Sequence, residues 1–477
     1  MKYIYKNRTL LASILLLLLS ATSCENFLEA PLPPDKITTD KVFGAKGTIE
    51  MAMLGVYNKA TAFYGQGAMV QTTEELADNL NYNPPTNIDV LANSEYDASN
   101  SESLSGLWSA PYDVIYQANT MLQSLPEETA NLSDAQTDQY MAENLFLRAL
   151  MYFELVRLYG DVPLVLNPDP SVSKSLARSP KAEVYTSVIA DLKDAMNRLP
   201  ETNISGLDAR RCSNKYVAEA LLARIYLFMG DYANAETAAT NVINSGNYSI
   251  ETDLTGVLMR RSSEIIFAMD GNMRDAPNSC FYYSFYGMPP FYQDWPEAYA
   301  WEYSGWGCLT QSAIDEFEAD DQRFATLYSY SAEENVFTLK YPYSLFYQEM
   351  ADADPQDFCV LRLSEMHLIR AEAKARKSSP DLAGAAADLN LIRDLHGGLP
   401  ETTANSQAEM LAALEHENRV EFMCEAHRWY DLVRTNRADA VLSQLDYKTG
   451  WSAHKVLMPI PAKELINNPN LTPNPGY

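Results

Sequence analysis

An apolar period of three to four residues recurs over most of this chain and constrains its fold more than any other feature. In the segment 141–158, Leu145, Ala149, Tyr152 and Val156 follow at steps of four, three and four residues. That spacing places them on one face of an α-helix. The same period predicts further helices at 46–61, 107–123, 181–199, 217–229, 233–244, 361–377, 382–395, 408–425 and 427–435. Strand-like alternation is brief, at 264–269 and 455–460, so the fold class is mainly α.

Two pairs of predicted helices are organised like a tetratricopeptide unit, in which two antiparallel helices meet across a tight turn. The pair at 217–244 has Gly230 and Asp231 between its helices, and the pair at 365–395 has its turn at 378–381. Alanines lie where the helices of each pair would cross, which lets the backbones approach. Generic alanine-rich hairpins are the alternative interpretation. The segment 248–357 between the pairs is irregular, and an insertion that long inside a helical array is usually functional.

The N-terminus has the organisation of a bacterial lipoprotein signal. Lys2, Lys6 and Arg8 precede the apolar run 10–19, which is too short to span a bilayer, and small residues then lead into Cys24. This pattern predicts a signal peptide at 1–23 and lipid attachment at Cys24. An ordinary cleavable signal followed by an incidental cysteine is the alternative.

The residues after Cys24 refine this expectation. Residue 25 is Glu, so the aspartate of a common inner-membrane retention signal is missing, which favours the outer membrane. The segment 24–36 contains Pro31, Pro33 and Pro34 and is expected to be a stiff, extended tether. The remaining residues, 37–477, form the predicted globular domain.

Charge and cysteine content exclude some functions. The formal net charge is −27 and no basic stripe offsets it, so phosphate backbones would be repelled and nucleic-acid binding is excluded. Six cysteines, Cys24 among them, are present without a C-x-x-C motif. Cys280 and Cys308 bracket one unusual segment and are candidates for a disulfide, and scattered buried thiols are the alternative.

That unusual segment, 281–306, is the strongest candidate for a ligand-binding region. Twelve of its 26 residues are aromatic, without a helical or alternating period, and its glycines and prolines are typical of loops. Sugar rings stack their C–H-rich faces on planar aromatics while their hydroxyls need polar partners. A packed floor for an irregular domain is the alternative for most of these rings. The ring side chains favoured for ligand contact are Tyr292, Trp295, Trp301 and Trp306.

A polar loop near the N-terminus is a second candidate. Asparagine side chains both donate and accept hydrogen bonds, which suits pairs of sugar hydroxyls. An ordinary turn is the alternative. The candidates on and beyond this loop are Asp78, Asn81, Tyr82, Asn83 and Tyr96, and Arg274 joins them from the edge of the insertion.

Several ordered sequence blocks resemble the SusD/RagB family of nutrient-binding outer-membrane lipoproteins. The sharpest are LRLSEMHLIRAEA at 361–373, ENRVEFMCEAHRWYDLVR at 417–434, VLMPIP at 456–461 and NPNLTPNPGY at 468–477. LWSAPY at 107–112 and LYGDVPL at 158–164 agree in the N-terminal half. The chain departs from the family at Ala426, where glycine is usual and a helix should tolerate alanine, and at Pro473, where glutamine is common.

The resemblance implies a right-handed superhelix of about four tetratricopeptide-like helix pairs, packed against an irregular, loop-rich ligand-binding region with a few short strands. In the family the N-terminal loop and the mid-chain insertion meet at the ligand site. Members cover a SusC-like TonB-dependent transporter at the cell surface, capture oligosaccharides or in some cases peptides, and catalyse nothing. We therefore expect an oligosaccharide ligand, such a transporter as partner, and no cofactor. The acidic loops permit a structural Ca²⁺ without specifying one.

One block invites a catalytic alternative. Glu421 and Glu425 lie one helical turn apart and are the candidates for a glycosidase acid–base pair, but Arg419, Arg428 and Arg434 surround them in sequence. Cationic neighbours depress carboxyl pKa values, whereas a general acid needs a raised one, so an ion-pair network is the favoured interpretation. The histidines show no metal-binding spacing, and no metal site is predicted. A glycoside hydrolase and a helical scaffold for protein contacts remain rivals to a binding protein.

Overall fold

The computed structural model describes residues 39–65, 68–82, 90–126, 132–202, 213–269, 307–330, 336–338, 340 and 357–477. Internal contacts divide the chain into two units, 1–49 and 50–477. In the first unit the structure describes helix α2 (Thr39–Phe43) and the start of α3 (Lys46–Gly65). There the hydroxyl of Thr48, in the first turn of α3, donates to the carbonyl of Ala45 at 2.7 Å.

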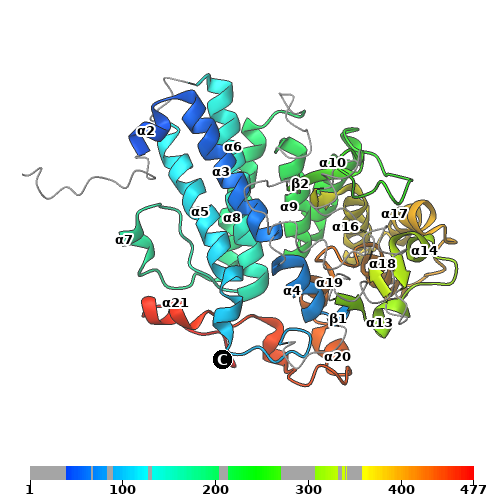
Figure 1. Cartoon of the computed structure of the whole chain (residues 1–477). Helices are drawn as coiled ribbons and strands as arrows, with labels where there is room; N and C mark the ends of the chain where they lie inside the picture. The colour runs from blue at the N-terminus through cyan, green and yellow to red at the C-terminus, as the bar shows by residue number, and fades with distance from the viewer. Residues whose placement is uncertain are drawn as a thin grey trace, which may run out of the picture. The chain divides into compact units, whose positions relative to one another are not determined.

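The described part of the second unit is mainly helical (Figure 1). Its helices are α4 (Ala68–Leu76), η2 (Ser101–Leu104), α5 (Gly106–Ser124), α6 (Asp134–Tyr159), α7 (Pro170–Ser173), α8 (Lys181–Arg198), α9 (Lys215–Met229), α10 (Tyr232–Asn244), α13 (Gln311–Ile314), α14 (Gln322–Leu327), α16 (Leu363–Arg376), α17 (Leu382–Ile392), η5 (Arg393–Gly397), α18 (Gln407–Glu421), α19 (Arg428–Arg434), α20 (Ala438–Leu442), η6 (Ala453–Val456) and α21 (Ala462–Asn467). Its strands are β1 (Leu80–Tyr82), β2 (Ile265–Met269), β3 (Gly307–Leu309), β4 (Tyr328–Tyr330), β5 (Val336–Thr338) and β6 (Phe358–Arg362).

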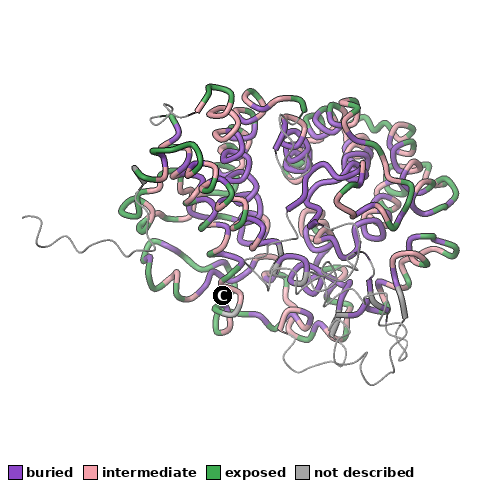
Figure 2. Tube along the Cα trace, turned by 45° about the horizontal axis from the view of Figure 1, so that its top comes forward, coloured by how far each residue is buried: buried purple, intermediate pink, exposed green. Residues whose placement is uncertain are grey.

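The long helices pack in a continuous series. Helix α5 packs on α6, α6 on α8, α8 on α9, and α9 on α10. The series then continues from α10 to α16, although the irregular segment 248–357 separates these helices in sequence. Figure 2 shows buried residues along the helix sides that face one another and exposed residues at the turns. The predicted mainly α, tetratricopeptide-like architecture is confirmed.

Both predicted helix pairs form, and their turns follow from local sequence. Gly230 ends α9 at a φ of +75°, a left-handed conformation that glycine adopts without a Cβ clash. Asp231 then caps α10 by accepting a hydrogen bond from the backbone N–H of Asn234. Asp381 caps α17 in the same way, accepting from the N–H of Gly384 at 2.9 Å.

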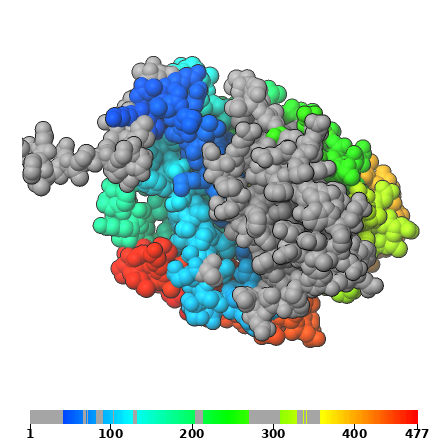
Figure 3. All heavy atoms as spheres, viewed as in Figure 1, coloured from blue at the N-terminus to red at the C-terminus, as the bar shows by residue number. Residues whose placement is uncertain are grey.

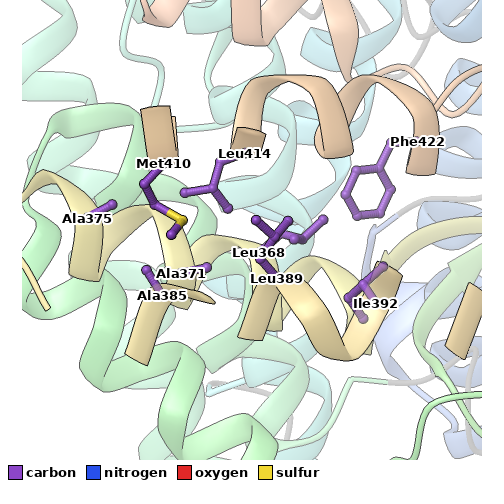
Figure 4. Packing of buried hydrophobic residues seen from close by; sticks show 9 residues of the cluster. All are labelled: Leu368, Ala371, Ala375, Ala385, Leu389, Ile392, Met410, Leu414 and Phe422. Atoms are coloured by element: carbon purple, nitrogen blue, oxygen red, sulfur yellow. The ribbon is translucent and has the colours of Figure 1, made fainter. Parts of the chain in front are cut away.

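The second pair packs on α18 through a compact apolar cluster (Figure 4). Helix α16 contributes small and branched side chains, so that α17 approaches closely and α18 covers the seam. The buried members are Leu368, Ala371, Ala375, Ala385, Leu389, Ile392, Met410, Leu414 and Phe422. This packing holds α18, which carries several charged side chains of the site, in a fixed position.

The described strands form three two-stranded antiparallel sheets: β1–β3, β2–β6 and β4–β5. The strand predicted at 264–269 is confirmed as β2. The strand predicted at 455–460 is wrong: the segment starts in η6, and the backbone N–H of Met458 donates to the carbonyl of Leu158 at 2.8 Å. This segment docks on the end of α6 instead of pairing with a neighbouring strand.

The C-terminal segment, red in Figure 3, lies at the surface beside the cyan N-terminal helices. The side-chain amide of Asn474 donates to the carbonyls of Tyr159 and Met458, at 3.0 and 2.8 Å. The guanidinium of Arg178 donates to the carbonyl of Thr472 at 3.0 Å. The blocks at 158–164 and 468–477 therefore contact one another in the fold.

Candidate functional site

Two segments far apart in sequence meet in the sheet β1–β3. The strands are antiparallel, with Leu80 opposite Leu309, Asn81 opposite Cys308 and Tyr82 opposite Gly307. Strand β1 belongs to the polar N-terminal loop, and β3 directly follows Trp306, the last residue of the aromatic segment. The expectation that the N-terminal loop and the mid-chain insertion meet is confirmed at these residues.

Most of the predicted ligand contacts lie outside the described residues. These are Arg274, Tyr292, Trp295, Trp301, Trp306 and Asn83, and the lipid-attachment residue Cys24 does too. Asn81 and Tyr82 are placed as backbone in β1. Cys308 is buried on β3, where burial raises the pKa of its thiol, and Cys280 is outside the described residues, so their pairing stays a prediction.

The prediction that Asp78 contacts the ligand needs correction, because its side chain is buried and forms ion pairs within the protein. Its carboxylate lies 2.9 Å from Nη2 of Arg419 and 2.9 Å from Nε of Arg428. Burial alone would raise the pKa of Asp78, but the charges of Arg428 and Arg419 lower it below its usual value. Asp78 therefore anchors the chain just before β1 and does not present its carboxylate to a ligand.

The prediction that Tyr96 contacts the ligand also needs correction. Its side chain is fully buried, and its hydroxyl donates to the carbonyl of Lys455 at 2.6 Å. The ammonium of Lys455 lies 5.1 Å from the ring centroid and donates to the carbonyl of Ser94 at 2.6 Å. Tyr96 thus fastens its loop to the C-terminal region, and it has no face available for stacking.

Glu74 on α4 also contacts the residues beside β1, and no sequence pattern predicted its role. It is fully buried and accepts hydrogen bonds from the side-chain amide of Asn79 at 2.7 Å and the backbone N–H of Ala426 at 2.9 Å. Burial raises its pKa to about 7, although these hydrogen bonds oppose the shift. A glutamate in an amphipathic helix gives no sequence signal that its partner lies some 350 positions away.

Glu421 and Glu425 belong to a buried ion-pair network, as the favoured interpretation held, but with different partners. Glu421 contacts Arg362 at 2.5 Å, Arg323 at 3.0 Å and His396 at 2.7 Å. Glu425 contacts Lys340 at 2.6 Å and Arg362 at 2.8 Å. The arginines expected from sequence lie elsewhere: Arg419 and Arg428 bind Asp78, and Arg434 binds Glu372.

The electrostatics of this network oppose acid catalysis. Burial would raise the pKa of Glu421, but the charges of His396 and Arg362 hold it well below its usual value. Burial likewise would lower the pKa of His396, yet Glu421 and Glu264 raise it to about 10. A deprotonated carboxylate between fixed cations has no proton to give to a leaving group.

Among the described residues, the ligand atoms of Glu264, His396 and Glu421 lie within 4.8 Å of one another, a spacing that would suit a metal ion. Both ring nitrogens of His396 already contact these carboxylates, at 3.3 and 2.7 Å. Nη1 of Arg362 lies 2.9 Å from Glu264 and 2.5 Å from Glu421. The imidazolium and the guanidinium thus supply the positive charge that a metal would otherwise bring.

A cavity of about 540 Å³ adjoins this network. It is lined by residues of the segment 251–262, by Thr326 and Leu327, and by His396 and Glu421 of the network. The described lining contains no Phe, Tyr or Trp side chain. This cavity therefore offers hydrogen-bonding groups but no described platform on which a sugar ring could stack.

Together the fold and the site define a tetratricopeptide-like helical scaffold in which β1 of the polar N-terminal loop pairs with β3, the strand that follows the aromatic-rich segment in sequence. This chain belongs to the SusD/RagB family. A family model described as "Starch-binding associating with outer membrane" matches residues 27–227, and one described as "SusD family" matches residues 337–477. The aromatic segment 281–306 lies between the two matches.

The relatives are distant but extend over most of the chain. A SusD-like protein of Formosa agariphila is 24% identical, with 99% of each chain covered. The starch-binding protein SusD of Bacteroides thetaiotaomicron is 25% identical, over 74% of this chain and 75% of that protein.

Solved structures share the fold. A laminarin-binding SusD-like protein superposes with a TM-score of 0.75 at 25% identity, covering 91% of this chain and all of the other. Surface glycan-binding protein A of Bacteroides thetaiotaomicron, solved with laminarihexaose, gives a TM-score of 0.74 at 20% identity and covers 90% and 99%. Within the described residues, no helix has the length and apolar character needed to cross a membrane.

Proposed function

We propose that this protein captures oligosaccharides at the cell surface, while anchored to the outer membrane through Cys24, and delivers them to a SusC-like TonB-dependent transporter. The observation that carries the proposal is the β1–β3 sheet. It pairs the Asn- and Tyr-containing loop with β3, which begins one residue after the segment 281–306 ends in sequence. We infer that the ligand binds where these two segments meet.

The chemistry of the two segments fits a sugar. A pyranose ring offers apolar faces for aromatic stacking and a rim of hydroxyls for amide hydrogen bonds. Trp295, Trp301, Trp306 and Tyr292 supply the rings, and Asn81, Tyr82, Asn83 and Arg274 supply polar partners. The similarity to a starch-binding protein and to a laminarin-binding protein supports the same ligand class.

Capture without catalysis is the second part of the proposal. Glu421, the first of the two glutamates considered as a catalytic pair, is ionised and enclosed by Arg323, Arg362 and His396. Glu425 is likewise buried and paired with cations. A retaining or inverting glycosidase needs one carboxyl that is protonated near neutral pH and reaches the glycosidic oxygen.

The test begins with a glycan panel that includes laminarin and starch oligosaccharides, screened against residues 25–477. Saturable binding, quenching of tryptophan fluorescence and no release of new reducing ends are expected. Binding of peptides in place of glycans, or the appearance of reducing ends, would overturn the proposal.

Variants then locate the site. Replacing Trp295, Trp301 and Trp306 together with Ala should weaken binding by at least about tenfold, since each stacked ring contributes roughly 1 kcal/mol. Tyr116, an aromatic that is 51% exposed on α5, is the matched control, and Tyr116→Ala should leave the affinity unchanged. Unchanged affinity in the triple variant would place the site elsewhere.

A further inference from the structure

The block 417–434 is one of the sharpest elements of the family resemblance, yet ligand capture as described so far gives it no role. We propose that Arg419, within this block, is a positioning residue for glycan capture. Its guanidinium fastens the start of β1 and the segment after β3 to α18, and so fixes the register in which the two candidate ligand segments meet. This inference rests on the proposed function.

Arg419 contacts the N-terminal segment just before β1. Nε of Arg419 donates to the side-chain oxygen of Asn79 at 3.1 Å. Nη2 lies 2.9 Å from the carboxylate of Asp78 and also donates to the backbone carbonyl of Asp78 at 3.3 Å. These two residues come directly before Leu80, so the guanidinium holds the chain where it enters β1.

Arg419 also contacts the part of the insertion that follows β3. The same guanidinium donates through Nη1 to Glu316 at 2.7 Å and through Nη2 to the hydroxyl of Ser312 at 2.9 Å. Both residues follow β3, on or just after α13. Arg419 is therefore shared between the two segments, and a planar guanidinium with donors on all three nitrogens is suited to such sharing.

A direct contact between the segments shows what Arg419 holds in place. Thr310 donates its backbone N–H to the carbonyl of Asn79 at 2.9 Å and its hydroxyl to the carbonyl of Asp78 at 2.6 Å. The pairing of β1 with β3 thus extends by one residue, at the point where Arg419 contacts both segments. A one-residue slip in register would move each side chain of a strand to the other face of the sheet.

Two further contacts from the same block secure this arrangement. Arg428 binds the other oxygen of Asp78 at 2.9 Å. Glu74, which accepts from the backbone N–H of Ala426, also accepts from the amide of Asn79. Residues 419, 426 and 428 therefore all act on the dipeptide 78–79, and the apolar cluster around Leu414 keeps α18 rigid.

Lysine is the informative replacement, because it keeps the charge but loses the planar fork. Arg148 provides the matched control. It is also buried, binds Asp191 through Nε and Nη2 at 2.8 and 2.7 Å, and donates to Asn119 at 2.7 Å, between α5, α6 and α8. Arg419→Lys and Arg148→Lys thus remove similar contacts, only one of which lies at β1–β3.

Amide hydrogen exchange of the full mature chain measures how firmly β1 and β3 are held together, with or without a ligand. Peptides covering 76–82 and 307–316 should exchange about tenfold faster in Arg419→Lys than in the wild type, because local opening becomes easier. The same peptides should be unchanged in Arg148→Lys. Equal protection in all three proteins would overturn the inference. If Arg419→Lys does not fold, Glu316→Ala removes one contact, and faster exchange of 307–316 is then expected.

Calorimetric titration with laminarihexaose and maltohexaose supplies the second readout. Arg419→Lys should weaken the affinity by about tenfold, and Arg148→Lys should not, since misplaced groups lose oriented contacts. Faster exchange with unchanged affinity would overturn the positioning role. If the wild type binds no glycan in the panel, the proposed function fails, whereas the exchange measurement still decides whether Arg419 holds the strands together.

Discussion

At the residue scale, Ala426 shows how a local feature is misjudged from sequence. Glycine is usual at this position in the family, and alanine was expected to be harmless in a helix. The structure places Ala426 outside any helix, at a φ of +64°, with Cys424 nearby at +66°. A left-handed conformation strains any residue that carries a Cβ, so the expectation was wrong for a clear steric reason.

Ala426→Gly should therefore stabilise the protein by roughly 0.5–1 kcal/mol, because relief of the steric strain exceeds the entropy that glycine loses on folding. Denaturant unfolding measures the difference. The control is Ala190→Gly on the exposed face of α8, which should destabilise by roughly 1 kcal/mol because it lowers helix propensity. Two changes of the same sign would contradict the assigned backbone conformation.

Glu143 on α6 is a second residue whose environment departs from its sequence appearance. It is buried, and its carboxyl accepts hydrogen bonds from Gln139 and Tyr57, which are both neutral. Burial raises its pKa to about 7. A carboxyl with a raised folded-state pKa binds its proton more tightly in the folded state, so its contribution favours folding at low pH and declines as the pH rises through 7.

Glu143→Gln removes this titration. Relative to the wild type, the variant should gain roughly 2 kcal/mol in unfolding free energy between pH 5 and pH 8, since each pKa unit corresponds to about 1.4 kcal/mol. Denaturant unfolding of both proteins at the two pH values provides the comparison. A difference that does not change with pH would show that Glu143 titrates normally.

At the scale of elements, helices and helix ends defined by local signals were predicted, whereas an end set by a distant partner was not. The pairs α9–α10 and α16–α17 follow from the apolar period, Gly230, and the capping residues Asp231 and Asp381. The helix predicted at 408–425 ends instead at Glu421. The left-handed residues beyond it are held by the carboxylate of Glu74, a partner that the local sequence does not reveal.

The same distinction between local signals and distant partners holds for the candidate site. The aromatic segment and the polar loop were recognised from composition, since stacking and hydroxyl recognition call for particular residue types. Which side chains are buried was not recognised: Asp78 and Tyr96 are polar residues of a loop, and their contacts with Arg419, Arg428 and Lys455 form only in the fold. Ion-pair partners far apart in sequence have no spacing rule from which to infer them.

At the scale of the whole molecule, anchoring and capture are proposed to act together. A short tether keeps the binding domain close to the membrane, which raises the effective concentration of captured glycan near a transporter. The segment 24–36, with its prolines, suits such a tether. The anchor would then matter for uptake without contributing to affinity.

Cys24→Ala tests this separation. The purified variant domain should bind oligosaccharide as the wild type does, because Cys24 lies far in sequence from every proposed contact. Cells that carry only the variant should lose the protein's contribution to glycan uptake. Growth on the identified glycan measures this, with membrane fractionation as a check that the variant is no longer anchored. Undiminished uptake by an unanchored protein would contradict the role of the tether.

The sequence by itself determined the helical class, the two helix pairs, the family, and the segments expected to bear ligand, because periodicity, turn residues and composition are local properties. Only the tertiary structure decided that α10 packs on α16 although the insertion separates them in sequence, and that β1 pairs with β3. Only it shows that Arg419 contacts the residues beside both strands. These contacts depend on the packing of distant elements, and a buried charge finds its partner only when the rest of the fold has brought the two together.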